Sequence, residues 1–171
     1  MKKALLVIDM QNDYLWEGRK KKFSYKDVDR LVTNTNNQIN KYNTDDCEII
    51  YIAQIIPNVW WGRMFFGFSI KGTEGAKLYS KVNLISKNYF EKTFSDAFTN
   101  KEFVKFVTEK NINSVAICGI DEGGCVSATA KGALKHGLSV EILTNSIDTC
   151  YPIKKVEKLR QELKSSGARY I

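Results

Sequence analysis

The residue best suited to chemistry in this sequence is Cys125, which follows an apolar run and a cluster of glycines. The run at residues 115–117 is typical of a buried parallel strand, and Gly119, Gly123 and Gly124 predict a tight turn after it. Small residues then continue as a helix. This order places a thiol at the first turn of a helix. Its N–H groups and dipole favour a thiolate and can bind a developing oxyanion.

Two further polar residues end predicted strands: Asp9 follows residues 4–8, and Lys92 follows residues 88–91. The carboxyl ends of parallel strands meet at one edge of a sheet. A thiol, a carboxylate and an ammonium gathered there form a nucleophile with a base and an orienting group. Taken singly, Cys125 could be a small buried residue, Asp9 a strand-end cap and Lys92 a surface residue.

In these segments the chain resembles the isochorismatase-like cysteine hydrolases, a family that includes nicotinamidases. The matching motifs are Ile8-Asp9-Met10-Gln11-Asn12-Asp13-Tyr14, Gly72-Thr73-Glu74-Gly75-Ala76, Lys92 with Ser95, Ala97 and Phe98, and Cys118-Gly119-Ile120 through Cys125-Val126 to Thr129-Ala130. Each motif alone is weakly specific. The four follow the family's order and cover almost the whole chain, which makes the resemblance strong.

The resemblance implies an acyl-enzyme mechanism. Cys125 would attack a carbonyl carbon, Asp9 would carry the thiol proton to the leaving amine, and Lys92 would balance the charge and favour the thiolate. Backbone N–H groups of Asp121 and Cys125 would form the oxyanion hole. The peptide bond between Ile120 and Asp121 would be cis, and water would release the acid.

The sequence departs from the metal-dependent members of that family after the second predicted strand. Those members carry Asp-x-His there and further histidines soon after, whereas this chain has Gln54, Ile55 and Ile56. Its only histidine, His136, cannot build a site of two or three histidines. We therefore expect no metal and no cofactor. Nicotinamide hydrolysis is disfavoured, because no metal would anchor the pyridine nitrogen.

Two acidic residues, Asp121 and Glu122, lie close to the predicted nucleophile. A carboxylate near a thiol raises its pKa unless it turns away or binds the substrate. Asp121 could therefore select a cationic or hydrogen-donating substrate, or it could be a solvent-facing turn residue. The expected substrate-binding residues are Gln11, Tyr14, Trp60, Trp61, Ile120 and Asp121, and Tyr151 is a further candidate. Aromatic walls suit a small planar or apolar group.

Three functions fit these residues. The first is hydrolysis of a C–N bond in a small amide, carbamoyl or ureido compound by an Asp9-Lys92-Cys125 triad. The second is an isochorismatase-type hydrolysis of a vinyl ether, whose dianionic substrate would need a basic pocket. The third is a binding or scaffold protein with an idle site, against which the three intact residues argue.

Composition limits the other possibilities. The chain has 171 residues and a formal charge of +7, but it lacks the basic and aromatic clusters of a nucleic-acid-binding protein. The dense basic run at residues 19–22 is either a solvated loop or an attractant for anionic ligands at the site's rim. The spacing of the four cysteines shows no Cys-x-x-Cys motif, and no signal peptide or membrane span is recognisable. We therefore expect reduced thiols and a cytoplasmic location.

The expected partners are a small-molecule substrate and further copies of the chain, as a dimer or tetramer, with no nucleic acid and no membrane. Dense aromatics at residues 54–69 indicate either a pocket wall and lid or an oligomer interface. Segment 72–79 is expected to be a turn and a short helix.

Alternating strands and helices predict a single α/β domain over residues 1–171, with three αβα layers and a Rossmann-like, mostly parallel sheet of six strands. The expected strands are 4–8, 48–53, 89–91, 114–118, 139–143 and 168–171, and the longer helices are 27–42, 101–111, 124–136 and 151–165. No Gly-x-Gly-x-x-Gly opens the first helix, so a dinucleotide site is not expected.

Overall fold

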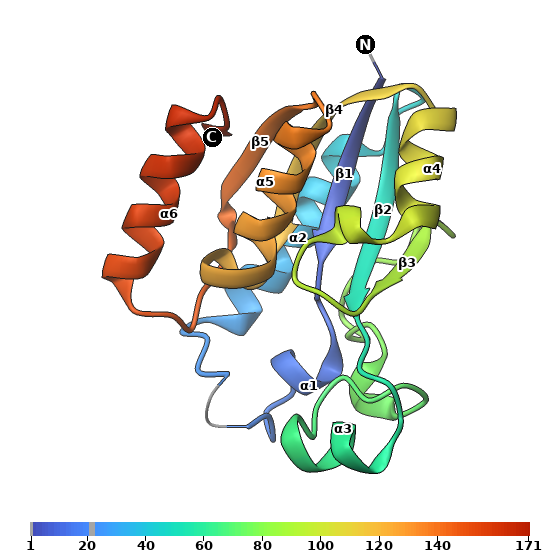
Figure 1. Ribbon diagram of the computed structural model, residues 1–171, viewed down its shortest axis with the longest axis vertical. Helices are drawn as coiled ribbons and strands as arrows, with labels where there is room; N and C mark the ends of the chain where they lie inside the picture. Colours follow the sequence, from blue (N-terminus) through green and yellow to red (C-terminus); the bar gives the residue numbers. More distant parts are fainter. Residues whose placement is uncertain (1, 21–22) are drawn as a thin grey trace.

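A six-stranded sheet forms the centre of the protein, and every strand pairing in it is parallel (Figure 1). The computed structural model describes residues 2–20 and 23–171. The strands are β1 (Lys2–Ile8), β2 (Cys47–Gln54), β3 (Tyr89–Lys92), β4 (Ile112–Gly119), β5 (Ser139–Ile147) and β6 (Arg169–Tyr170), in the spatial order β3-β2-β1-β4-β5-β6. This confirms the predicted α/β sheet, which is parallel at all five pairings.

The apolar runs form strands because both faces of the sheet are covered. In β1, Leu6 and Ile8 pack into one hydrophobic cluster, while Leu5 and Val7 pack into another. The alternation of side chains along a strand sends successive residues to opposite faces. A run with no polar residue therefore fits a strand buried on both sides.

Four longer helices complete the three layers (Figure 1). Helix α2 (Val28–Tyr42) covers one face with Leu31, Val32 and Ile39. Helices α4 (Lys101–Glu109), α5 (Ser127–Lys135) and α6 (Ile153–Ser165) supply side chains to the cluster on the other face. Within the described ranges, no helix has the length and apolar character needed to span a bilayer.

Short elements surround the carboxyl ends of the strands. They are α1 (Asn12–Leu15), α3 (Trp60–Phe65) and the turns η1 (Glu74–Ala76), η2 (Ala97–Thr99) and η3 (Glu122–Val126). Helices α1 and α3 lie below the sheet in Figure 1. Neither was predicted, because elements of four and six residues are too short to show a hydrophobic period. The expected helix at 124–136 is also different: a π-helical turn, η3, precedes α5.

The order of the strands creates a switch point beside β1. The chain leaves β1 toward β2 and β3 on one side, while β4, β5 and β6 extend on the other. Connections therefore diverge at the carboxyl ends of β1 and β4 and leave a crevice, which is where open α/β sheets bind ligands.

Candidate active site

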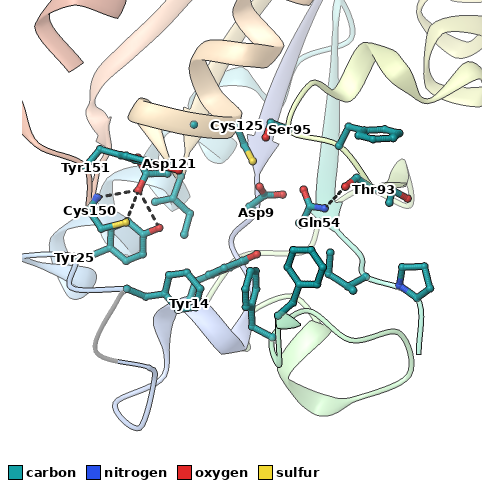
Figure 2. A pocket seen from close by; sticks show the side chains of 18 of the residues that line it. Asp9, Tyr14, Tyr25, Gln54, Thr93, Ser95, Asp121, Cys125, Cys150 and Tyr151 are labelled. Carbon is teal, nitrogen blue, oxygen red and sulfur yellow. Dashed lines mark hydrogen bonds between the residues drawn. The ribbon is translucent and has the colours of Figure 1, made fainter. Parts of the chain in front are cut away.

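One buried ammonium contacts both a carboxylate and a thiol at this crevice. Lys92 Nζ lies 2.9 Å from Asp9 Oδ2 and 3.2 Å from Cys125 Sγ. The Lys92 side chain is fully buried, and that of Asp9 is 4% exposed. In Figure 2 the Cys125 thiol points toward Asp9. The three residues that the sequence singled out therefore lie together, from three different parts of the chain.

Each residue is placed by the end of a strand. Asp9 follows β1 with a left-handed backbone (φ 52°), and its N–H donates to Ile52 O at 2.8 Å. Lys92 is the last residue of β3 and pairs in register with Gln54 at the end of β2. On the other side of β1, Gly119 has φ 105°, and a Cβ there would collide with Ile8 O. Glycine thus lets β4 end directly against β1, shortly before turn η3 begins.

The resting thiol is neutral. Burial and, to a smaller extent, Asp9 raise the pKa of Cys125 to about 12, against the opposing effect of Lys92. Lys92 favours the thiolate, as expected, but removing the thiol from water has the larger effect on its pKa. The pKa of Lys92 is raised, because attraction to Asp9 and Cys125 outweighs the opposing effect of burial. A protonated lysine thus faces a protonated thiol.

Turn η3 presents backbone N–H groups beside the thiol. Gly124 N and Val126 N each donate to Asp121 O at 3.0 Å, and Glu122 N donates to Asp148 O. Among the described residues, the N–H of Asp121 makes no hydrogen bond, and that of Cys125 makes none outside its own turn. The peptide bond between Ile120 and Asp121 is cis, as the resemblance implied. The Asp121 N–H, one of the two expected oxyanion donors, is thus left for a ligand.

The carboxylate of Asp121 is held by the protein rather than offered to a substrate. It accepts five hydrogen bonds, from Gly123 N, Tyr25 Oη, Thr149 Oγ1, Cys150 N and Cys150 Sγ. Figure 2 shows those from Tyr25 and Cys150 as dashed lines. Asp121 is 9% exposed, so it is not the solvent-facing turn residue that the sequence allowed. Its side chain fastens η3 to the loop after β5.

Glu122 turns away from the thiol and pairs with Arg160 of α6. Arg160 Nε and Nη2 lie 2.5 and 2.7 Å from the two carboxylate oxygens, and Glu122 is 2% exposed. The carboxylate is therefore buried with one bidentate partner. This pair connects η3 to α6.

We expect Arg160→Met to lower the free energy of unfolding by about 3 kcal/mol, because it leaves the Glu122 carboxylate buried without its counter-charge. Urea unfolding of the variant measures this loss. Lys158→Met removes an exposed cation from the same helix and serves as the control. Equal stability of the two variants would show that the pair contributes nothing to the fold.

An aromatic pocket of about 590 Å³ opens in front of the thiol. Tyr14, Phe23, Phe68 and Phe66 form a continuous edge-to-face cluster along it, with ring centroids 4.7–6.1 Å apart. The other lining residues are Asp9, Tyr25, Gln54, Ile56, Pro57, Trp61, Thr93, Phe94, Ser95, Ile120, Asp121, Gly124, Cys125, Cys150 and Tyr151. The expected substrate-binding residues Tyr14, Trp61, Ile120 and Asp121 thus lie at the pocket.

Two expected substrate-binding residues do not reach the pocket. Trp60 is 73% exposed and lies on the outer side of α3, because a one-and-a-half-turn helix cannot turn both neighbouring tryptophans inward. Gln11 is fully buried behind the site, where its amide bonds the backbone of Gln54 and Ala76. Gln11 therefore supports the site instead of lining it.

The basic run at residues 19–22 acts partly as a support for the pocket. Arg19 donates to the backbone oxygens of Trp16, Phe23 and Tyr25, and Lys20 donates to Phe66 O. Lys21 and Lys22 lie outside the described residues. Phe23 and Tyr25, which sequence reasoning missed, reach the pocket on this loop. Aromatics directly after a basic loop were the only available signal.

The residues at the family's metal positions do not fit a metal ion. Gln54 Oε1 accepts from Lys92, its Nε2 donates to Thr93 O, and Ile56 has no donor atom. Among residues 2–20 and 23–171, no three His, Cys, Asp or Glu side chains lie close enough to hold one. Zinc sites of this kind use a carboxylate and an imidazole. Here Gln54 has an amide whose oxygen and nitrogen are both already hydrogen-bonded, and Ile56 has an alkyl chain.

Comparisons with known proteins agree with this architecture. The Isochorismatase domain model matches residues 3–168. The isochorismatase family protein YddQ of Bacillus subtilis is 23% identical over 150 residues, which cover 87% of this chain and 79% of the relative. An isochorismatase-like hydrolase from Alkaliphilus metalliredigens superposes with a TM-score of 0.83 at 20% identity, covering 99% and 94% of the two chains.

A solved pyrazinamidase of Pyrococcus horikoshii in complex with zinc has a TM-score of 0.79 at 26% identity and covers 100% of this chain and 99% of its own. Fold and comparisons together define a hydrolase with an α/β fold, whose candidate site lies at the carboxyl edge of a parallel sheet. The chain belongs to the isochorismatase family.

Proposed function

We propose that the protein is a metal-free cysteine hydrolase that cleaves the C–N bond of a small amide, carbamoyl or ureido compound. The observation that supports this most is the contact of the buried Lys92 ammonium with both Asp9 and Cys125. A thiol, a base and a charge-balancing group within hydrogen-bonding reach are what nucleophilic acyl transfer requires.

In the proposed reaction, Asp9 removes the thiol proton as Cys125 Sγ bonds to the carbonyl carbon. The N–H groups of Asp121 and Cys125 bind the oxyanion. The C–N bond then breaks, and the proton on Asp9 passes to the leaving nitrogen. Water attacks the thioester, and the acid and the free thiol are released. Lys92 remains protonated and stabilises whichever of its two neighbours carries the negative charge.

The pocket favours an uncharged, apolar substrate. Within residues 2–20 and 23–171, its lining contains no lysine, arginine or histidine. The Lys92 ammonium donates its hydrogen bonds to acceptors of the protein, and the Asp121 carboxylate accepts hydrogen bonds from donors of the protein. Neither charge is therefore available to a charged substrate. In the part of the chain that the structure describes, the buried acceptor Asp9 Oδ1 has no hydrogen-bond partner. A primary amide could supply it with an N–H while its apolar group contacts the aromatic wall.

The same lining argues against the vinyl-ether alternative, whose dianionic substrate needs cations that the pocket does not present. An idle scaffold function would not require the buried contact of Lys92 with both partners. Removing an ammonium and a carboxylate from water has a cost in free energy. A catalytic role explains why the protein retains such a contact, and a scaffold role does not.

Ammonia release from matched amides tests the proposal. We expect benzamide to react at least about tenfold faster, by kcat/KM, than its para-carboxylate derivative, since the buried carboxylate would lack a counter-charge. Phe94→Arg places a cation at the pocket mouth and should reduce this preference, whereas Phe65→Arg on the exposed side of α3 should not. Faster cleavage of the charged amide by the wild type would contradict the proposed substrate.

We expect the purified protein to hold no stoichiometric zinc, iron or manganese, and its activity to survive chelation. The reason is the amide and alkyl side chains at Gln54 and Ile56. Elemental analysis measures the metal content directly. One tightly bound transition metal per chain would contradict this prediction.

The proposal also includes a homo-oligomer, as a dimer or tetramer, acting in the cytoplasm. Exposed side chains of α3 and its flanks support self-association: Val59, Trp60, Met64 and Phe65 are 38–73% exposed. All four cysteines are free, as a reducing compartment would require.

A further inference from the structure

Gln54 is the uncharged side chain that accepts a hydrogen bond from the Lys92 ammonium. It ends β2, is 8% exposed, and points into the pocket beside Asp9 (Figure 2). Its Oε1 accepts from Lys92 Nζ at 2.9 Å, and its Nε2 donates to Thr93 O at 2.7 Å. Because Thr93 O can only accept, the amide nitrogen must face it. The amide oxygen is thereby directed at Lys92.

The contacts of Lys92 use every proton of its ammonium group. An ammonium has three N–H donors. The three acceptors here are Asp9 Oδ2, Gln54 Oε1 and Cys125 Sγ. These acceptors come from the ends of β1 and β2 and from η3, so they surround the nitrogen on three sides. Without Gln54, one buried N–H would have no acceptor, and the nitrogen could rotate away from one of its other partners.

Gln54 is itself held from behind by Gln11. The Gln11 amide accepts from Gln54 N at 2.9 Å and donates to Gln54 O at 3.0 Å and to Ala76 O at 2.7 Å. Gln11 is fully buried. It therefore fixes the backbone of Gln54 as a neighbouring strand would, beyond the last residue of β1. The chain of contacts runs from Gln11 through Gln54 to Lys92.

We infer that Gln54 is a positioning residue that holds the Lys92 ammonium toward both Asp9 and Cys125, an inference that rests on the proposed function of this site. An amide is suited to the task because it accepts a proton without adding charge. A carboxylate at this position would compete with Cys125 for the lysine's charge. An alkyl chain would leave a buried N–H unsatisfied.

The charged groups around Lys92 determine whether its pKa rises or falls when Gln54 is substituted. Asp9 and Cys125 contact it, and Asp96 on the following loop is close enough to interact with it. Glu91 precedes it but pairs with Lys71 at 3.4 Å. Removing the neutral acceptor while these groups stay in place destabilises the ammonium. Adding a carboxylate stabilises it.

The test is titration of Lys92 in full-length protein with ¹³C-labelled lysine, which needs no substrate. The resonance missing in Lys92→Met identifies the group. We expect Gln54→Met to lower its apparent pKa by about one unit or more, and Gln54→Glu to raise it. Gln161→Met, on the exposed side of α6, should leave it unchanged.

A Gln54 that merely filled space would leave the apparent pKa of Lys92 unchanged in Gln54→Met, so the downward shift in that variant is the deciding result, and the upward shift in Gln54→Glu shows that the side chain at this position is within reach of the ammonium. An unchanged apparent pKa in folded Gln54→Met, or a lowered one in Gln54→Glu, would overturn the inference even if amides are hydrolysed. If Gln54→Met does not fold, Gln54→Leu, which also removes the acceptor without adding charge, is titrated in its place. Opposite shifts in a protein that cleaves no amide would instead support this role and overturn the proposed function.

Discussion

Cys125→Ala is expected to lower amide hydrolysis by on the order of 10⁴-fold, because it removes the only atom proposed to bond to the substrate. The fold should survive, since alanine removes a single sulfur atom from a residue that packs at the margin of its cluster. Cys125→Ser should be nearly as inactive, because a hydroxyl is harder to ionise than a thiol. Ammonia release measures both variants.

A matched control keeps this result specific. Cys47→Ala removes a partly buried thiol at the start of β2, away from the carboxyl edge of the sheet, and should keep full activity. Near-normal turnover by folded Cys125→Ala would exclude a covalent mechanism.

Lys92→Met is expected to slow alkylation of Cys125 about tenfold or more at any given pH, with hydrolysis lost in parallel. Burial and Asp9 already raise the thiol pKa to about 12, and Lys92 is the group that lowers it. Removing the ammonium therefore moves the pKa still higher and reduces the thiolate fraction at every pH below it. Rates of reaction with iodoacetamide from about pH 8 to 10.5 measure the shift.

The methionine keeps the volume of the lysine stem, so core packing should survive, although the Asp9 carboxylate loses its buried counter-charge. Lys71→Met, whose exposed ammonium lies near Glu91, is the control. Identical alkylation profiles for Lys92→Met and the wild type would show that Lys92 does not act on the nucleophile.

The sheet and the three central residues could be predicted from the sequence because both depend on local signals. A strand buried on both faces is an uninterrupted apolar run, as in residues 4–8 and 115–117. Asp9 comes directly after such a run, and Lys92 is the last residue of the short strand β3. Parallel pairing then brings strand ends together without any knowledge of the loops.

The rest of the site depends on contacts between distant residues, which leave no periodic signal. Asp121 is held by Tyr25, Thr149 and Cys150, of which Tyr25 lies 96 positions away. Nothing in the sequence near Asp121 indicates that its carboxylate is already occupied. Burial of Cys125 depends equally on loop side chains, so the thiol's high pKa could not be read from its position before a helix.

The aromatic segment after β2 illustrates an alternative that sequence alone left open. Trp61, Phe66 and Phe68 line the pocket, whereas Trp60 and Phe65 are about 70% exposed. The segment therefore contributes a pocket wall and an apolar outer surface at once. Helix α3 turns Trp61 toward the pocket and Trp60 and Phe65 toward solvent. Residue type alone does not reveal this difference in orientation.

The central claim, that Cys125 forms a thioester with the substrate, is tested most directly by intact-protein mass spectrometry after acid quenching during turnover of an uncharged aryl amide. We predict that the wild type gains the mass of the acyl group, that peptide mapping places it on Cys125, and that Cys125→Ala gains none. Steady ammonia release by enzyme whose Cys125 is fully carbamidomethylated, with no acyl adduct at any time, would contradict the claim.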